Sequence, residues 1–198
     1  TSIDWPGPNE GVSPTDGHPV QTVNWMEAVV FCNWLSFKEG LRPYYVHDEN
    51  GEWDVDDDSL GYRLPGDTEW ELACRAGTTT TYSCGDDTFL NQYALFRRED
   101  HADVCGTKMC NAWGFFDMHG NVWEWVGEVS DEVLSEQTGV QQDIKGRPNA
   151  TPQPTVKALR GGSRGAASVM IRSDSRTWHL PTHRSLALGF RVARTIEP

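Results

Sequence analysis

Apolar residues recur at helical spacing in the stretch that follows Asn24. They lie three and four positions apart, so they would share one face of a helix. Asn24 and Glu27 have the form of a capping box, and Gly40 provides a stop signal. We therefore predict a helix between residues 24 and 40. Its apolar face consists of Ala28, Phe31, Cys32 and Leu35.

A second helix is predicted from Asp67 to Ala76, with acidic residues in its first turn and Gly77 after its end. Residues 20–23, 44–46 and 122–125 predict short strands, with a turn at 48–52 after the second of them. Residues 83–112 and 127–157 are turn-rich or polar and predict long loops. Two helices, short strands and long loops together predict an α+β domain.

The segment from Gly114 to Trp125 follows neither helix nor strand periodicity over most of its length. Gly114 and Gly120 indicate positions where the backbone needs a positive φ or a close approach. Asp117 and Glu124 are hard oxygen donors on either side of the Gly120 turn, and Ca²⁺ takes carboxylate and backbone oxygens. The residues alone leave two interpretations open: a calcium site, or two acids that cap turns or pair with arginines.

The charge of the chain is unevenly distributed. Residues 160–198 carry seven arginines against Asp174 and Glu197, a balance of +5, whereas the whole chain has a formal net charge of −12. The preceding 159 residues therefore carry −17. The basic part indicates either a binding surface or arginines that pair with acids of the same domain. We expect no nucleic-acid partner, because the chain as a whole is strongly acidic.

The length of 198 residues predicts a single domain over residues 1–198 with a substantial core. No apolar run is long enough to span a bilayer, so we expect no membrane insertion by this domain. The first residue is Thr1 rather than Met, which leaves a truncated N-terminus or a larger parent protein open. Five cysteines, an odd number, argue against a complete disulfide framework.

Five short motifs are spread along the chain. They are Arg63-Leu64-Pro65, Glu69-Trp70-Glu71, the stretch from Asp117 to Trp125, Arg160-Gly161-Gly162-Ser163 and Gly189-Phe190-Arg191. In this order they resemble the formylglycine-generating enzyme (sulfatase-modifying factor) family over residues 18–194. The resemblance implies a C-type-lectin-like fold, in which short strands and long loops are organised around a buried aromatic core.

The resemblance also implies one calcium site. Its ligands would be the side chains of Asp117 and Glu124 and the backbone carbonyls of Gly120 and Val122. A second calcium site of the family does not carry over, because Leu95 replaces the usual asparagine and the acidic loop does not align.

Copper chemistry is where the sequence departs from the family. The family's enzymes oxidise a substrate cysteine with copper held by two cysteines after the Arg-Gly-Gly-Ser motif, and soft thiolates select Cu(I). Residues 164–188 contain no cysteine, and Ala166 and Ile171 stand in that region. Cys105 and Cys110 have a similar spacing but precede the central motif. We therefore predict a non-catalytic member of the family that binds no copper.

Non-enzymatic members of the family include the variable proteins of bacterial diversity-generating retroelements, whose segment between the last two motifs is hypermutated. Here the family's framework residues are kept in that segment: Arg172, Ser173, Arg176, Pro181 and Arg184. The residues between them share no chemical theme, as expected of a diversified surface or of one ordinary binding surface. The predicted ligand-binding residues are Arg164, Gly165, Ala166, Met170, Thr177, Trp178, His179, His183, Ser185 and Leu186.

The favoured hypothesis is a monomeric binding module for a protein or another macromolecular ligand. We expect Trp178 and His179 on a loop beside Pro181, with Trp178 as a binding hot spot. Two alternatives stay open: a copper oxidoreductase with an altered metal site, at Cys105 and Cys110 or at His179 and His183, and a sensor domain of a bacterial signalling protein. An extracellular or cell-surface location is favoured over a cytoplasmic one.

Overall fold

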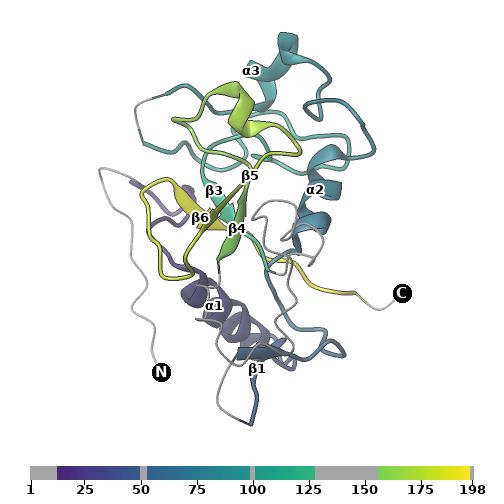
Figure 1. Cartoon of the computed structure of the whole chain (residues 1–198), viewed down its shortest axis with the longest axis vertical. Helices are drawn as coiled ribbons and strands as arrows, with labels where there is room; N and C mark the ends of the chain where they lie inside the picture. The colour runs from purple at the N-terminus through teal and green to yellow at the C-terminus, as the bar shows by residue number, and fades with distance from the viewer. Residues whose placement is uncertain (1–12, 50–52, 99–100, 128–155, 197–198) are drawn as a thin grey trace, which may run out of the picture.

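The computed structural model describes residues 13–49, 53–98, 101–127 and 156–196. At its centre is a four-stranded sheet in the order β5-β4-β3-β6 (Figure 1). These strands are β3 (Trp123–Trp125), β4 (Lys157–Arg160), β5 (Arg176–His179) and β6 (Leu188–Phe190). β4 is antiparallel to both β3 and β5, whereas β6 runs parallel to β3. The central motif thus lies between strands supplied by the last third of the chain.

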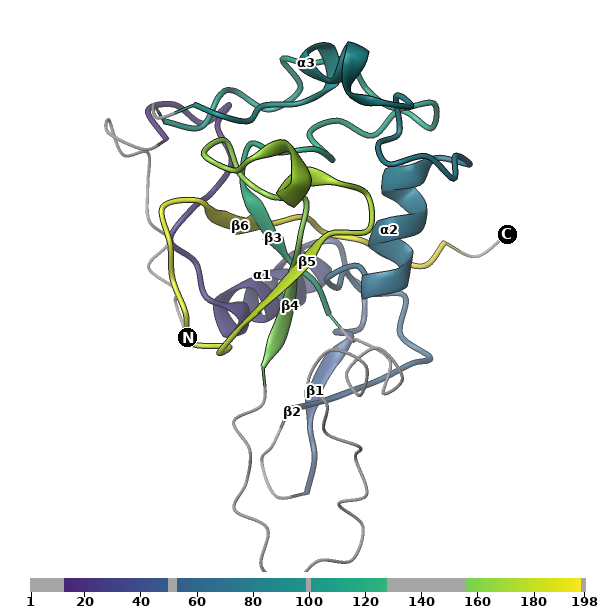
Figure 2. The ribbon, with the colours of Figure 1, turned by 45° about the horizontal axis from the view of Figure 1, so that its top comes forward.

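The first helix confirms the capping-box prediction. α1 (Trp25–Lys38) begins after Asn24, whose side chain accepts from the Glu27 N–H at 2.9 Å while the Glu27 carboxylate accepts from the Asn24 N–H at 2.9 Å. Gly40 follows its end with φ of 71°. α1 packs against the sheet (Figure 2) through Ala28 and Cys32, which are fully buried.

The second helix and the hairpin also form where predicted. α2 (Asp67–Arg75) ends at Ala76, which has the left-handed φ of 48°, and Gly77 follows with φ of 87°. β1 (Tyr45–His47) pairs antiparallel with β2 (Trp53–Val55), and part of the turn between them lies outside the described residues. The elements that were not predicted include strands β4, β5 and β6, a one-turn helix, α3 (Leu90–Tyr93), and two 3₁₀ turns, η1 (Asp87–Phe89) and η2 (Ser168–Ile171).

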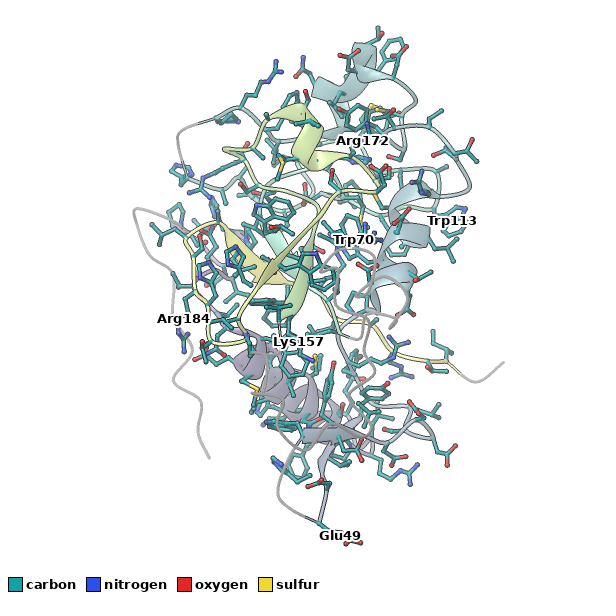
Figure 3. The ribbon with its side chains drawn as sticks, in the orientation of Figure 1. Glu49, Trp70, Trp113, Lys157, Arg172 and Arg184 are labelled. Atoms are coloured by element: carbon teal, nitrogen blue, oxygen red, sulfur yellow. The ribbon has the colours of Figure 1, made fainter. Side chains whose placement is uncertain are left out.

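Among the described residues, buried side chains form three clusters. The largest joins α1, β1 and the sheet through Trp25, Val29, Tyr45, Trp125 and Leu188. A second joins α2 to the sheet around Trp70, which is 1% exposed and lies between α2 and β4 (Figure 3). The third, around Leu90 and Ile171, lies under α3 and η2. The buried aromatic core that the family resemblance implies is therefore present.

Two local predictions are wrong. Residues 20–23 form no strand; Thr22 has φ of 60°, which is incompatible with extended pairing, and its N–H donates to Ser185 O at 3.1 Å. Trp178 and His179 lie on β5 rather than on a loop, because residues 176–179 pair with all of β4. The long loop predicted at 127–157 lies almost entirely outside the described residues.

The framework arginines tie these elements together, as the charge distribution suggested. Arg160 on β4 is fully buried and donates to Asp67 at 2.5 and 2.8 Å and to Glu71 at 2.9 Å, both on α2. Arg176 donates to the same two carboxylates, at 2.9 and 3.2 Å. Arg184 pairs with Glu27 at the start of α1. Arg172 differs, because it pairs locally with Asp174 in an exposed contact.

Candidate functional site

Glycine and carboxylate geometry define the central turn. Gly120 has φ of 110°, and a Cβ there would overlap the carbonyl oxygen of Leu95, so no other residue fits this crossing. Past the turn, Glu124 on β3 points into the core and is 5% exposed. Arg191 donates to its two oxygens at 2.5 and 2.6 Å, and the Trp70 indole N–H donates to one of them at 2.7 Å. Glu124 therefore serves as an internal ion-pair partner.

The predicted calcium ligands share one hollow of about 600 Å³. Asp117, Gly120, Val122 and Glu124 all line it, together with Arg191. One oxygen of Asp117 accepts from the Gly106 N–H at 2.8 Å, whereas Oδ1 is buried and has no hydrogen-bond partner among the described residues. Burial raises the pKa of this carboxyl.

The donor set fits a calcium ion only in part. Asp117 Oδ1 has the chemistry of a calcium ligand, but both oxygens of Glu124 are already held by Arg191 and Trp70. A cation bound to Glu124 would have to displace the guanidinium of Arg191 or lie beside it, at a cost from like-charge repulsion. The one-site calcium prediction stays a prediction, now with Asp117 as its main carboxylate.

His119, within the central motif, is structural. It is 2% exposed, and its Nδ1 donates to Ile171 O at 2.8 Å while Nε2 accepts from the Ser83 N–H at 3.1 Å. Burial lowers its pKa, so the neutral ring is favoured. The ring joins the loop at 83 to η2, beneath the surface formed by residues 164–171.

The predicted ligand-binding residues divide into three groups in space. Arg164, Gly165 and Leu186 come together, since Arg164 Nη1 donates to Leu186 O at 3.1 Å, and Ser185 bonds the neighbouring Ala187 N–H at 3.2 Å. Met170 is 40% exposed on η2. Leu186 is 51% exposed, so this part of the segment presents apolar area to solvent.

His179 and His183 form the second group. Their rings stack with centroids 4.0 Å apart and an interplanar angle of 10°. Burial and the neighbouring ring of His183 lower the pKa of His179. The intervening Pro181 carbonyl accepts from the Trp25 N–H at 3.0 Å, so the turn that carries the pair is anchored to the start of α1.

The third group consists of Trp178, Ala166 and Thr177, the first two of which pack against separate buried clusters. Trp178 is half-buried and packs against the cluster of Trp70, Val126 and Ala158, and its Nε1 is buried without a hydrogen-bond partner among the described residues. Ala166 packs against the cluster under η2. Thr177, on β5 beside Trp178, pairs with Leu159 of β4. Trp178 and Ala166 therefore have a packing role that their place between framework motifs did not reveal.

Two arginines that the sequence did not single out belong to the same surface. Arg97 and Arg98 line a hollow of about 480 Å³ with Ser163, Arg164, Gly165 and Ala187. The Arg97 N–H donates to Ala166 O at 3.1 Å and the Arg98 N–H to Arg164 O at 2.7 Å, so the two segments lie side by side. The Arg-Arg pair within the acidic part of the chain was the available signal, but its partner segment lies some 66 residues further on.

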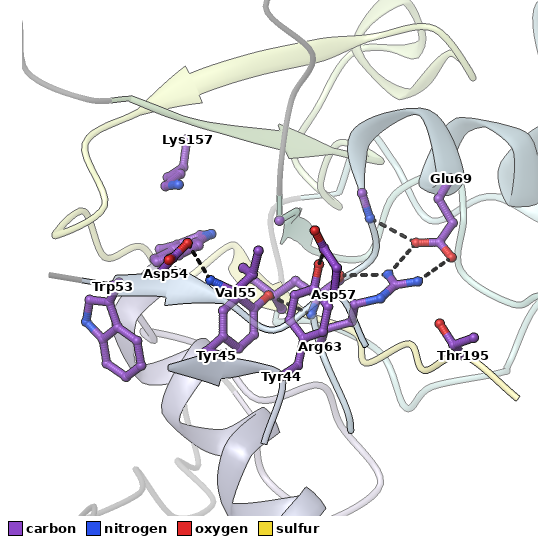
Figure 4. A pocket seen from close by; sticks show the side chains of 14 residues that line it. Tyr44, Tyr45, Trp53, Asp54, Val55, Asp57, Arg63, Glu69, Lys157 and Thr195 are labelled. Atoms are coloured by element: carbon purple, nitrogen blue, oxygen red, sulfur yellow. Dashed lines mark hydrogen bonds and ion pairs between the residues drawn. The ribbon is translucent and has the colours of Figure 1, made fainter. Parts of the chain in front are cut away.

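A third hollow of about 420 Å³ lies between β1, β2, the start of α2 and the start of β4 (Figure 4). Its charged groups are engaged with other groups of the protein: Arg63 pairs with Glu69 at 2.6 Å, Asp57 contacts the Tyr44 hydroxyl at 3.3 Å, and Lys157 lies 4.1 Å from the Trp25 ring centroid. The charged groups of this hollow therefore already have partners within the protein, and the hollow is a junction between elements of the fold.

The oxidoreductase alternative names two residue pairs, Cys105 with Cys110 and His179 with His183, and neither belongs to a larger cluster of metal-ligating residues in the described part of the chain. No group of three or more His, Cys, Asp or Glu residues there is placed to hold a metal ion. All five cysteines are free, with Cys105 exposed and Cys110 half-buried. In the same described residues, no helix combines the length and apolarity required to cross a membrane.

Comparisons with known proteins agree with the fold. The solved structure of Treponema denticola variable protein 1 matches 98% of this chain and 76% of its own, with 26% identity and a TM-score of 0.75. The formylglycine-generating enzyme of Mycobacterium tuberculosis is 29% identical over 134 residues, 60% of this chain and 36% of that protein. The inactive C-alpha-formylglycine-generating enzyme 2 of Bos taurus is 27% identical over 205 residues, 94% of this chain and 54% of that protein.

These matches confirm the α+β, formylglycine-generating-enzyme type of fold with its C-type-lectin-like arrangement. The chain spans about one third to one half of the length of the two relatives named. A family model for the sulfatase-modifying factor enzyme 1-like domain matches residues 2–196. The chain therefore belongs to the sulfatase-modifying factor (formylglycine-generating enzyme) family.

Proposed function

We propose that this chain is a non-catalytic module that binds a protein ligand through the surface formed by residues 164–188, in the manner of a retroelement variable protein. One observation carries the proposal: the segment that holds the cysteine pair in the family's enzymes contains no cysteine and instead presents unrelated side chains on a fixed frame. Similarity to an inactive family member and to a variable protein supports it.

The frame explains how such a surface tolerates sequence change. Arg160, Arg176 and Arg184 bond to α1 and α2, and their contacts do not involve Met170 or Leu186. Exposed side chains on loops held by a rigid scaffold are the usual carriers of binding. The sensor-domain alternative uses the same surface and differs in the parent protein.

To test the binding surface, proteins that bind the wild-type domain are selected from a displayed library of randomised proteins. We expect selected binders to lose affinity for Met170→Asp and Leu186→Asp, whereas Leu72→Asp, on the 57% exposed Leu72 of α2, leaves them unchanged. Binders that are indifferent to both surface variants would contradict the proposal.

The absence of catalysis is tested separately. The purified domain is incubated with Cu(I) and a cysteine-containing peptide substrate of the family's enzymes, with an active family member as control. We expect no formylglycine by mass spectrometry, and its formation would refute the non-catalytic assignment. The retroelement origin predicts a reverse-transcriptase gene and a near-repeat of codons 164–188 beside the gene.

A further inference from the structure

The stacked rings of His179 and His183, which we name the histidine pair, lie within the proposed binding surface. Their centroids are 4.0 Å apart and their planes are 10° from parallel. Both side chains are half-buried, so part of each remains in contact with solvent. Histidine changes its charge between about pH 5 and about pH 8. The charge of this part of the surface therefore depends on pH in the range around neutrality.

The face-to-face contact couples the charges of the two rings. A neutral ring can stack on a neutral or a protonated ring, whereas two imidazolium rings at this distance repel each other. Two strongly interacting groups take up their protons in two separate steps that belong to the pair. In agreement with this coupling, burial and then the neighbouring ring of His183 lower the pKa of His179. The stack is therefore stable while the pair carries no more than one proton.

The described elements that meet the pair place three further charged groups beside it. Lys157 of β4 lies opposite His179 in the strand register. Arg184 directly follows the pair in sequence and forms an ion pair with Glu27 at the start of α1. Two of these groups are cations, and the carboxylate of Glu27 is already held by one of them. A second proton on the pair would therefore add positive charge on a segment that already contains cations.

The turn between the two rings is held in place by backbone bonds. The His183 N–H donates to Leu180 O at 2.9 Å and closes the turn, and the Trp25 N–H donates to Pro181 O at 3.0 Å and ties it to α1. Leu180 is 47% exposed, so the turn presents an apolar side chain between the two rings. Repulsion between the rings acts across this turn. Opening of the stack would therefore change the shape of the surface around Leu180.

From this geometry we infer that the histidine pair makes the binding surface acid-sensitive: the protein ligand is held at neutral pH and released when a second proton separates the rings. The inference rests on the proposed binding function and names the regulation of that same site. A ligand that contacts the stacked arrangement binds it more tightly than the opened one, and this difference sets the size of the effect. Affinity is thus complete above the second protonation step and is lost as pH falls through it.

The direct test follows the histidine ring and backbone amide signals of the whole chain by NMR, without any ligand. We expect the pair to take up its protons in two steps between about pH 8 and about pH 5, and the amides of residues 180–184 to shift with the second step. His183→Phe keeps a ring that can stack but cannot be protonated. In this variant His179 should take up its proton at a higher pH than in the wild type, because a neighbouring positive charge is removed.

The binding test uses proteins selected on the wild-type domain at neutral pH from a displayed library that contains no histidine, so that the pH dependence belongs to the domain. We expect binders that depend on Met170 and Leu186 to lose affinity about tenfold in acid, the effect of disfavouring one proton by one pH unit. Either single variant, His179→Phe or His183→Phe, holds at most one proton on the pair and should abolish this loss.

His18→Phe is the matched control. His18 also contacts a second histidine, His101, with ring centroids 5.8 Å apart in an edge-on arrangement, but this contact lies outside residues 164–188. We expect the acid-induced loss of affinity to persist in this variant. Melting temperatures at neutral pH verify that each variant is folded.

Four results would overturn the inference: protonation of both rings in one common step, amides of residues 180–184 that do not shift, a loss of affinity that persists in the His179→Phe and His183→Phe variants, or two steps that disappear when a chelator removes a bound metal ion. Its failure is distinguishable from failure of the proposed function. Binders that depend on Met170 and Leu186 at every pH would reject the acid sensitivity alone. Binders that ignore residues 164–188 altogether would reject the binding surface itself.

Discussion

The buried ion pair between Asp67 and Arg160 offers the sharpest test of how this fold is held together. Asp67 is the first residue of α2 and is 2% exposed, and Arg160 in the middle of the sheet is fully buried. The carboxylate accepts two bonds from Arg160, at 2.5 and 2.8 Å, and two from Arg176, at 2.9 and 3.4 Å. Asp67→Asn keeps the size of the side chain and removes its charge.

The expected loss of folding stability follows from the charge of Arg160, which remains buried after the substitution. Breaking a buried pair by removing one charge typically costs about 3–5 kcal/mol, because the other charge stays buried without compensation. Glu71 still contacts Arg160 at 2.9 Å, which places the loss near the lower end. Loss of a negative charge from the first turn of α2 adds about 0.5 kcal/mol. We therefore expect about 3–4 kcal/mol, or about 10 °C in melting temperature for a chain of this size.

Urea unfolding followed by tryptophan fluorescence measures the change. Asp174→Asn is the matched control, since the same substitution there affects an exposed pair with Arg172, and we expect no measurable loss. If Asp67→Asn loses less than about 1 kcal/mol, or no more than Asp174→Asn, then the buried pair does not stabilise the fold in the way argued here.

Three further predictions concern other conditions and residues. Burial would raise the pKa of Asp67, but hydrogen bonds and charges from Arg160 and Arg176 lower it below its ordinary value. The contribution of Asp67 to folding stability is therefore complete above the unfolded-state pKa and is lost as pH falls through the folded-state pKa. Asp67→Asn should accordingly flatten the acid limb of a curve of folding stability against pH. Calcium should raise the melting temperature and Asp117→Ala should abolish that rise; an unchanged melting temperature with calcium or a chelator would contradict the site. Trp178→Ala should destabilise the domain by about 2 kcal/mol in urea unfolding because the ring packs on the core, whereas Trp178→Phe should retain most of the stability; a silent Trp178→Ala would restore its assignment as an exposed binding residue.

The parts of the fold that were predictable from sequence have local causes. α1 begins and ends on signals within residues 24–40, and α2 has acidic residues at its start and a glycine after its end. Gly120 could be identified as a special backbone position from its context alone. Glu124 could not be assigned, because a carboxylate beside a turn is equally suited to calcium or to an arginine, and Arg191 lies 67 residues away.

Non-local pairing explains what the sequence did not reveal. Trp178 was expected on a loop because Pro181 is close in sequence, yet its backbone pairs with β4 and its ring packs against a cluster that includes residues of α2 and β4. The hollow beside Arg97 and Ser163 depends on backbone bonds between residues 97–98 and residues 164–166. Nothing local to either segment encodes that meeting, so half of the candidate site was invisible without the structure.

The ion pairs that stabilise the fold do not involve the exposed side chains of the proposed binding surface. Arg160 and Arg176 bond to α2, and Arg184 bonds to α1, so residues 160–184 are anchored at three points to acids that precede these arginines by 93 to 157 residues. Met170 lies between the first two of these arginines and Leu186 follows the third. Both side chains are exposed and lie outside the three buried clusters of the described residues. Substitutions at such exposed positions typically change stability by no more than about 0.5 kcal/mol. If the proposed function holds, exposed positions such as Met170 and Leu186 can be substituted with little change in folding stability. Trp178 lies in the same segment but packs against the core, so its substitution is expected to cost stability.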